Sequence, residues 1–252
     1  MAKPATTSAR KALVVLESIG LFKVRSFAEI SADVRLPKST LLRLIGDLVE
    51  QGFVRRTAHG GYTVALKMWR IGCNAVQFEQ VHDQVMPIMR SLVDRIGETT
   101  HYAVYENGYS LYVEKVDGVH PIRSYTSVGG RSPAYATATG KTLLAWRDQS
   151  EIERIAKSAE RWTKRTIIRP AAIIKEMAEV RRLGYAVNRG EWRESVWGVA
   201  APVYDRHDKV IAAVGITGPA DRMELKLPTY AKHVLAAASE ISRHCGAMME
   251  AS

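Results

Sequence analysis

The stretch that decides the fold of the N-terminal part runs from residue 26 to residue 52 and reads SFAEISADVRLPKSTLLRLIGDLVEQG. Ser26 and Glu29 form a capping-box pattern, in which each side chain bonds the backbone amide of the other and starts a helix that we expect to end near Val34. Pro37 suits the first turn of a following helix, because its missing N–H would have no partner there. The stretch therefore predicts two helices with a tight turn between them.

The second of these helices is amphipathic and is predicted to reach about Gln51, with Gly52 placed for its C-terminal cap. Apolar residues recur at the i, i+3, i+4, i+7 spacing of a buried face, at Leu41, Leu44, Ile45 and Leu48. Hydroxyl and cationic side chains fall outside that face, at Lys38, Ser39, Thr40 and Arg43. Such groups contact phosphates and base edges when a helix enters the major groove, so these four are predicted DNA-binding residues.

A further helix is predicted before this stretch, over residues 9–19. Its inward side is expected to consist of Leu13, Leu16 and Ile19. The residues of the following helix that are available to pack against it are Ala28 and Ile30. The N-terminal part therefore has enough apolar positions for a small three-helix core.

A short β-hairpin follows the helices. Residues 53–56 and 62–64 predict two strands around a glycine-bearing turn, and Arg55 and Arg56 place positive charge on the hairpin, where we expect them to bind DNA. Three helices, a tight turn and a basic hairpin together indicate a winged helix-turn-helix over residues 1–65. The alternative is a small helical packing domain with a solvated polar face.

Charge is unevenly distributed along the 252 residues, whose formal net charge is +10. Residues 1–80 contain 12 Lys and Arg against 6 Asp and Glu, whereas the remaining 172 residues contain 24 against 20. A basic N-terminal third favours a polyanionic partner such as double-stranded operator DNA. Charge alone fits a merely basic soluble surface equally well, so the helical pattern carries the DNA-binding prediction.

Composition excludes several other classes of protein. No apolar run approaches the roughly 18–20 residues that a membrane span needs, and the first ten residues lack the apolar core of a signal peptide. A cytoplasmic protein without a membrane partner is expected. Cys73 and Cys245 lie far apart without histidines at ligand spacing, and the seven histidines are scattered, so no metal and no cofactor is expected.

The chain resembles the IclR family of bacterial regulators over nearly its whole length. The motifs that carry the resemblance are Leu36-Pro37-Lys38-Ser39-Thr40 with Arg43, Glu50-Gln51-Gly52-Phe53-Val54, Gly97-Glu98-Thr99, Gly129 to Pro133, Ala136-Thr137-Ala138-Thr139-Gly140-Lys141, Arg181 to Tyr185, Ala200-Ala201-Pro202 and Gly218-Pro219. Helix-turn-helix fragments are common, and it is their combination with the Ala-Thr-Gly-Lys stretch that makes the resemblance specific.

The resemblance implies an α+β architecture: the winged helix-turn-helix, then a GAF-like effector-binding domain with a curved antiparallel sheet flanked by helices. It also implies a homodimer or a homotetramer. We expect a linker helix over residues 66–80 and the effector-binding domain over residues 81–252. The residues themselves predict strands at 100–104, 110–116, 196–204 and 210–217. They predict helices at 137–146, 151–157, 173–183 and 229–248.

The resemblance also implies where a small-molecule effector binds. The positions that carry over are Ala138, Thr139, Asn188, Gly198, Gly215 and Thr217. Backbone amides at Ala138 and Thr139 would face an anion at a helix start. Glycine at two of these positions and the loss of an acid at Asn188 suggest a roomier pocket, and Trp192 is a candidate aromatic wall. A carboxylic acid, with an aromatic one as a candidate, is the predicted effector.

Other interpretations of these motifs were weighed. Gly140-Lys141-Thr142 resembles the end of a phosphate-binding loop, but Tyr135 replaces the required earlier glycine. The acids of residues 176–179 are expected to form a solvated helix face, and Trp192 and Trp197 fit ordinary core or dimer packing equally well. The leading functional hypothesis is an effector-controlled, non-enzymatic transcription factor in catabolic gene regulation. The alternatives are an enzyme that turns over its ligand and a structural DNA-coating protein.

Overall fold

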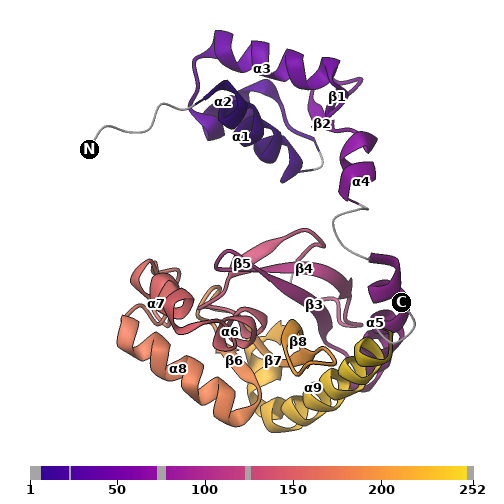
Figure 1. Ribbon diagram of the computed structural model, residues 1–252, viewed down its shortest axis with the longest axis vertical. Helices are drawn as coiled ribbons and strands as arrows, with labels where there is room; N and C mark the ends of the chain where they lie inside the picture. The colour runs from indigo at the N-terminus through magenta and orange to yellow at the C-terminus, as the bar shows by residue number, and fades with distance from the viewer. Residues whose placement is uncertain (1–6, 23, 73–77, 123–125, 249–252) are drawn as a thin grey trace. The chain divides into compact units, whose positions relative to one another are not determined.

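The computed structural model describes residues 7–22, 24–72, 78–122 and 126–248, and the chain divides into two compact units, residues 1–78 and 79–252 (Figure 1). We call them the N-terminal unit and the C-terminal unit. Cys73 lies outside the described residues, as do residues 73–77 of the predicted linker helix. None of the described helices is both long and apolar enough to span a bilayer.

The N-terminal unit contains the predicted helices and hairpin. Its elements are α1 (Ser8–Gly20), α2 (Phe27–Val34), α3 (Lys38–Glu50), β1 (Val54–Arg56), β2 (Tyr62–Val64) and α4 (Leu66–Gly72). The capping box is present, since the Ser26 side chain accepts from the Glu29 amide and the Glu29 carboxylate accepts from the Ser26 amide at 2.7 Å. Pro37 lies at the N-cap of α3, one position before the predicted first turn, and Gly52 adopts a φ of +72° after the helix.

The core of this unit confirms one predicted face and corrects another. Leu41, Leu44, Ile45 and Leu48 are all buried, together with Ile30. Leu13 and Ala28, however, are exposed, because Val15 and Ile19, four residues apart, form the inward side of α1 and leave Leu13 on the outer side.

The C-terminal unit is built on a six-stranded antiparallel sheet with strand order β5-β4-β3-β8-β7-β6. The strands are β3 (Thr99–Glu106), β4 (Tyr109–Val116), β5 (Arg131–Pro133), β6 (Ala186–Arg189), β7 (Val196–Tyr204) and β8 (Val210–Pro219). Asn107 and Gly108 both have positive φ, as a two-residue hairpin turn requires. The sheet and its helices confirm the α+β class, with β5 and β6 as strands that the sequence pattern had not predicted.

Helices pack on both faces of this sheet (Figure 1). The helices of this unit are α5 (Phe78–Ile96), α6 (Ala138–Ala145), α7 (Gln149–Lys157), α8 (Pro170–Leu183) and α9 (Ala220–Met248). Helices α6 and α9 contact the strands directly, α8 packs against α6, and α7 packs against α8. Of the helix predicted for residues 66–80, the structure describes α4 up to Gly72 and α5 from Phe78, and the residues between them lie outside the described part of the chain. Helix α9 begins nine residues before its predicted start, since it continues through Pro228.

Candidate DNA interface and effector pocket

The first candidate surface is the start of α3. Lys38, Ser39 and Arg43 are exposed, and Thr40 is half-buried. Arg43 has one weak ion pair, with Asp47 at 3.7 Å on the same helix. An exposed pair of this kind contributes little to stability, so the guanidinium remains available to another anion. The predicted helix residues therefore share one solvent-facing, cationic end of α3.

The hairpin supplies the second part of this surface. Arg55 and Arg56 are both exposed on β1, which pairs antiparallel with β2. The Arg56 guanidinium lies over the Tyr62 ring, 5.6 Å from its centroid, and this contact orients it. Residue Arg25 extends the hairpin through a two-way backbone bridge with Tyr62, at 2.9 and 2.7 Å. The wing is thus fixed to the segment between α1 and α2.

The Arg25 side chain joins the helices of the N-terminal unit, a role that the sequence analysis missed. Its Nη1 donates to the Ser18 hydroxyl at 2.9 Å and to Asp33 at 2.8 Å, while its Nη2 donates to the Glu29 carbonyl at 3.1 Å. The Ser18 hydroxyl also donates to Asp33, at 2.7 Å. That bond and the guanidinium hold the pKa of Asp33 below its usual value. The feature of the sequence that could have indicated this role is Ser18, a polar residue on the inner side of α1 that needs a hydrogen-bond partner when it is buried.

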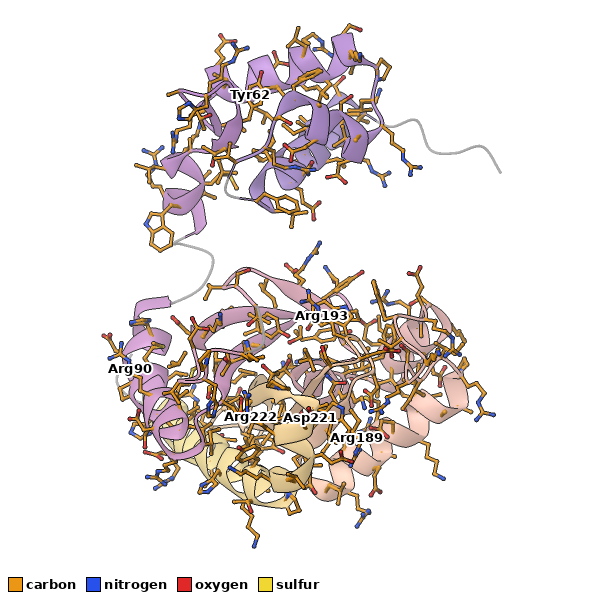
Figure 2. The ribbon with its side chains drawn as sticks, turned by 180° about the vertical axis from the view of Figure 1, so that it is seen from behind. Tyr62, Arg90, Arg189, Arg193, Asp221 and Arg222 are labelled. Carbon is orange, nitrogen blue, oxygen red and sulfur yellow. The ribbon has the colours of Figure 1, made fainter. Side chains whose placement is uncertain are left out.

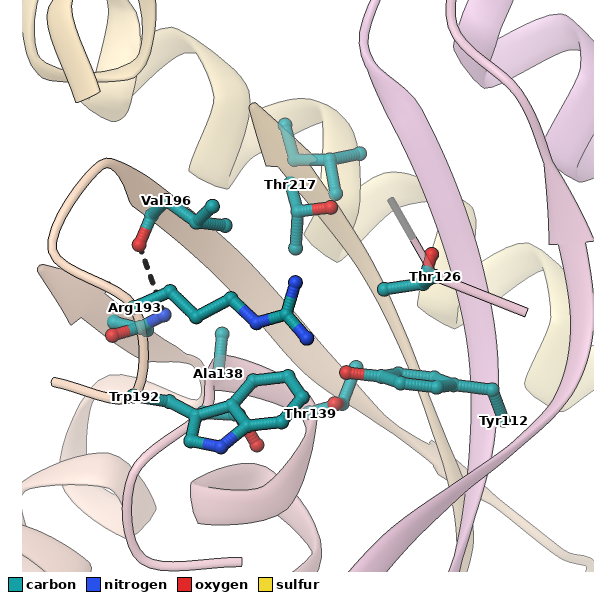
Figure 3. A pocket seen from close by; sticks show the side chains of 11 residues that line it. Tyr112, Thr126, Ala138, Thr139, Trp192, Arg193, Val196 and Thr217 are labelled. Carbon is teal, nitrogen blue, oxygen red and sulfur yellow. Dashed lines mark hydrogen bonds between the residues drawn. The ribbon is translucent and has the colours of Figure 1, made fainter. Parts of the chain in front are cut away.

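A small pocket in the C-terminal unit gathers most of the predicted effector residues (Figure 3). It lies where the start of α6 meets β4, β8 and the loop after β6. The lining residues are Tyr112, Thr126, Thr137, Ala138, Thr139, Asn188, Trp192, Arg193, Val196, Ile216 and Thr217. Five of the seven predicted positions are among them, and Gly198 and Gly215 are not. Tyr112, Thr126 and Arg193 were not predicted.

The two glycines do not enlarge the pocket. A Cβ atom at Gly198 would lie 2.9 Å from the Ile216 carbonyl and 3.5 Å from the Ala138 Cβ, and one at Gly215 would lie 2.7 Å from the Ala200 Cβ. Their missing side chains therefore allow tight packing behind the pocket, where α6 approaches the sheet. The expectation that glycine here makes a roomier pocket is wrong for that reason.

Hydrogen-bond donors converge at the start of α6. The Thr137 side chain caps the helix by accepting from the Gly140 amide at 3.3 Å, so Ala138 and Thr139 are the first two helical residues. The first amides of a helix have no partner within it and attract anions. Burial raises the pKa of the Tyr112 phenol, which keeps it protonated. The Thr217 hydroxyl is buried without a hydrogen-bond partner in the part of the chain that the structure describes.

The loop between β6 and β7 brings Trp192 and Arg193 to the pocket. Asn188 folds this loop, because its Oδ1 accepts from the Glu191 amide at 2.9 Å and its Nδ2 donates to the Val196 carbonyl at 3.3 Å (Figure 3). The Asn188 amide group is thus already engaged with the backbone. Asn188 lines the pocket, and its main observable role is to shape the loop.

A buried ionic cluster anchors the base of the same loop. The Lys141 ammonium is fully buried and contacts Glu176 at 2.8 Å, Glu191 at 2.6 Å and the Val187 carbonyl at 3.0 Å. Burial raises the pKa of Glu191, and the charge of Lys141 opposes that shift. Lys141 is therefore not placed like a phosphate-binding lysine. Glu176 belongs to this cluster rather than to a solvated helix face, which corrects that expectation.

The described residues contain no group of three or more His, Cys, Asp or Glu side chains that could hold a metal ion. Within the same residues the pocket lining includes no Cys, His, Asp or Glu. His101 lies nearby, with its Nε2 against the Thr126 hydroxyl, but burial lowers its pKa to about 3 and keeps the ring neutral. The pocket therefore offers neutral donors, aromatic rings and one arginine.

Comparison with known proteins agrees with both units. The model of the IclR helix-turn-helix domain matches residues 8–58, and that of the bacterial transcriptional regulator IclR C-terminal domain matches residues 73–243. The regulator KdgR of Escherichia coli K12 is 32% identical over 244 residues, covering 95% of this chain and 93% of KdgR. The repressor IclR of the same organism is 27% identical, covering 88% of this chain and 84% of that protein.

Solved structures show the same fold. The IclR protein of Thermotoga maritima superposes with a TM-score of 0.70 at 28% identity, covering 95% of this chain and 98% of that one. An IclR homologue from Microbacterium hydrocarbonoxydans superposes with a TM-score of 0.82 at 22% identity, covering 98% of this chain and all of the other. Fold, motifs and sequence agree: the chain belongs to the IclR family of DNA-binding transcriptional regulators.

Proposed function

We propose that this regulator controls catabolic genes in response to a small carboxylic acid that binds the pocket of the C-terminal unit. One observation carries the proposal: the pocket combines aromatic walls, amides at a helix start and an arginine, with no acidic lining residue among those described. Such a lining favours a ligand with a flat apolar body and a negative charge. Ala138, Thr139, Trp192 and Thr217 are the proposed contacts, with Asn188, Gly198 and Gly215 shaping the site from behind.

A structural neighbour supports this class of ligand. The structure of the Microbacterium hydrocarbonoxydans homologue is described as a complex with 4-hydroxybenzoate, an aromatic carboxylic acid. Its identity to this chain is 22%, so the ligand is a starting point for screening rather than an assignment. An aromatic acid also suits the Trp192 ring, which lies beside the Arg193 side chain, and the Tyr112 phenol, whose hydroxyl points into the pocket (Figure 3).

The proposed DNA contacts are the exposed side chains of α3 and the wing, namely Lys38, Ser39, Thr40, Arg43, Arg55 and Arg56. A helix in the major groove with a basic wing beside it uses such groups for base edges and phosphates. A homodimer or homotetramer would present paired recognition helices to a pseudo-palindromic operator. Effector binding then favours one arrangement of the DNA-binding units, and this coupling between acid and DNA must be reciprocal.

Binding to the DNA upstream of the regulator's own gene tests the proposal. Fluorescence anisotropy with that fragment and with a scrambled fragment, across a salt series, should show tighter binding to the native sequence at every salt concentration. Affinity for both should fall as salt rises, because the protein must displace counterions from the DNA phosphates, and added salt opposes their release. Equal affinity for both fragments would leave only a basic surface and would contradict operator recognition at that site.

A further inference from the structure

The pocket is filled by one of its own side chains. Figure 3 shows the Arg193 side chain crossing the pocket, with its guanidinium between Trp192, Thr217 and Tyr112. The space left beside it is about 20 Å³, which is enough for a single water molecule. An organic acid of even a few carbon atoms cannot enter this space unless a lining side chain moves.

Arg193 is the lining residue best able to move. It lies exposed on the β6–β7 loop, where its backbone carbonyl accepts from the Val196 amide at 3.0 Å. Within the described residues, the contact of its side chain is with the Trp192 ring, whose centroid is 4.6 Å from the guanidinium carbon. An exposed cation–π contact of this kind is weak. Glu191, two residues earlier, is fixed by Lys141 and accepts at its carbonyl from the Thr166 hydroxyl at 2.6 Å. The base of the loop is thus anchored, while the Arg193 side chain is held by a single stacking contact.

Among the described residues, none in the pocket lining carries a charge opposite to that of Arg193. The lining residues that the structure describes include no carboxylate, and Arg193 forms no ion pair within the described chain. The groups around the guanidinium are instead neutral, among them the unpartnered hydroxyl of Thr217. A guanidinium presents a planar fork of donors that matches a carboxylate at two atoms. A carboxylate is therefore the ligand group that this charge would bind most strongly.

We infer that Arg193 is both the side chain that closes the pocket and the residue that pairs with the carboxylate of the effector. This inference rests on the proposed function and sharpens it. The side chain swings away from the space between Trp192 and Tyr112, the flat body of the acid takes that space, and the guanidinium then binds the carboxylate at the pocket mouth. The site selects carboxylates and rejects the corresponding neutral amides.

Isothermal titration calorimetry on the full chain tests the inference with three acids and their amides. The acids are butanoate, benzoate and 4-hydroxybenzoate, and the amides are butanamide, benzamide and 4-hydroxybenzamide. At least one acid should bind the wild type, and its amide should bind at least tenfold more weakly. Arg193→Met keeps a side chain of similar length without the charge, and it should weaken binding of that acid by about 10- to 100-fold.

Two further variants separate charge from closure. Arg189→Met removes an equal charge from the last residue of β6, just before the loop. This residue does not line the pocket and lies well away from Arg193 in Figure 2, so acid affinity should stay within twofold. Arg193→Ala removes both charge and bulk, so it should bind the acid more weakly than the wild type does, and the amide more tightly. An unchanged melting temperature in each variant confirms that it folds.

Three results would overturn the inference: equal acid affinity in the wild type and in Arg193→Met, equal affinity for acid and amide, or no binding of any acid at 10 mM. Operator binding without ligand, measured on the same preparations, distinguishes this failure from failure of the proposed function. A wild type that prefers its operator but meets any of these three results remains a regulator whose effector is recognised without Arg193.

Discussion

The proposed DNA surface, formed by the start of α3 and the β1–β2 hairpin, and the pocket of the C-terminal unit both use arginine side chains. The two sites differ in how freely those side chains can reach a ligand. Arg43, Arg55 and Arg56 are exposed on a helix with a buried apolar face and on a hairpin that a backbone bridge joins to Arg25. Arg193 crosses a nearly filled pocket from a loop whose backbone is anchored, while its own side chain is exposed. The first arrangement is ready for a large polyanion and needs no local rearrangement. The second admits a small anion only after the cation has moved, and that requirement allows ligand binding to be selective.

The anchor of the loop gives the largest expected effect. Lys141→Met should lower the free energy of unfolding of the C-terminal unit by about 3–5 kcal/mol, because it leaves the buried Glu191 carboxylate without its cation. Denaturant unfolding followed by tryptophan fluorescence measures this, since Trp146, Trp162, Trp192 and Trp197 all lie in this unit. A loss below about 1 kcal/mol would mean that the ionic cluster does not anchor the loop.

Glu176→Gln is the matched control for that cluster. The Glu176 side chain is 29% exposed and Glu191 keeps the ion pair with Lys141, so the loss should be clearly smaller. An equal loss in the two variants would show that the cluster acts through Glu176 rather than through the loop.

The glycine behind the pocket should also be sensitive. Gly215→Ala places a Cβ 2.7 Å from the Ala200 Cβ and 2.9 Å from the Val199 carbonyl, so it should destabilise the C-terminal unit by about 1–3 kcal/mol. The same denaturant experiment measures this loss. Unchanged stability in Gly215→Ala would revive the expectation of a roomier pocket.

Operator affinity should respond to α3 and not to the pocket. If Arg43 contacts a base, Arg43→Ala should weaken operator binding by about 1–3 kcal/mol, and if Arg55 contacts a phosphate, Arg55→Ala should reduce the salt slope by about one. Acid affinity measured by calorimetry should be unchanged in both, while Arg193→Met should keep wild-type operator affinity. Unchanged operator affinity in Arg43→Ala would remove this residue from the contact surface.

Acid sensitivity of the N-terminal unit is the smallest expected effect. The pKa of Asp33 is lowered by the Ser18 hydroxyl and by Arg25, so this stabilisation is present above the unfolded pKa and is lost as pH falls through the folded value. The side chain is 47% exposed, which limits the contribution to about 1 kcal/mol or less. Asp33→Asn should therefore lower thermal stability at pH 7 and match the wild type near pH 2; a gap that persists at pH 2 would contradict this origin.

The features that could be predicted from the sequence are those formed between residues close together in the chain. Ser26 and Glu29 act over three residues, and the spacing of Leu41 to Leu48 lies within one helix, so both are readable from local pattern. The strands β5 and β6 have three and four residues, and pairing with distant partners defines them. Strands this short contain too few residues to show a clear alternation of apolar and polar positions in the sequence.

The pocket residues likewise include some that could be predicted from the sequence and one that could not. Resemblance brought Ala138, Thr139 and Thr217 to the pocket, but not Arg193, whose role depends on the path of a loop closed by Asn188 and Lys141. The sequence suggested that Gly215 leaves a space, whereas α6 and β7 fill it in the fold. The atoms that lie beside a glycine are determined by tertiary packing, and the residue type alone does not reveal them.

Reciprocal binding tests the central claim, that acid and DNA bind one coupled protein. The operator dissociation constant would be measured without acid and at saturating acid, and the acid dissociation constant without and with operator. The account predicts that the two ratios are equal and differ from one, within the 5- to 150-fold range typical of coupled sites. Tight binding of both ligands with both ratios equal to one would show two independent sites on one chain and would contradict effector control.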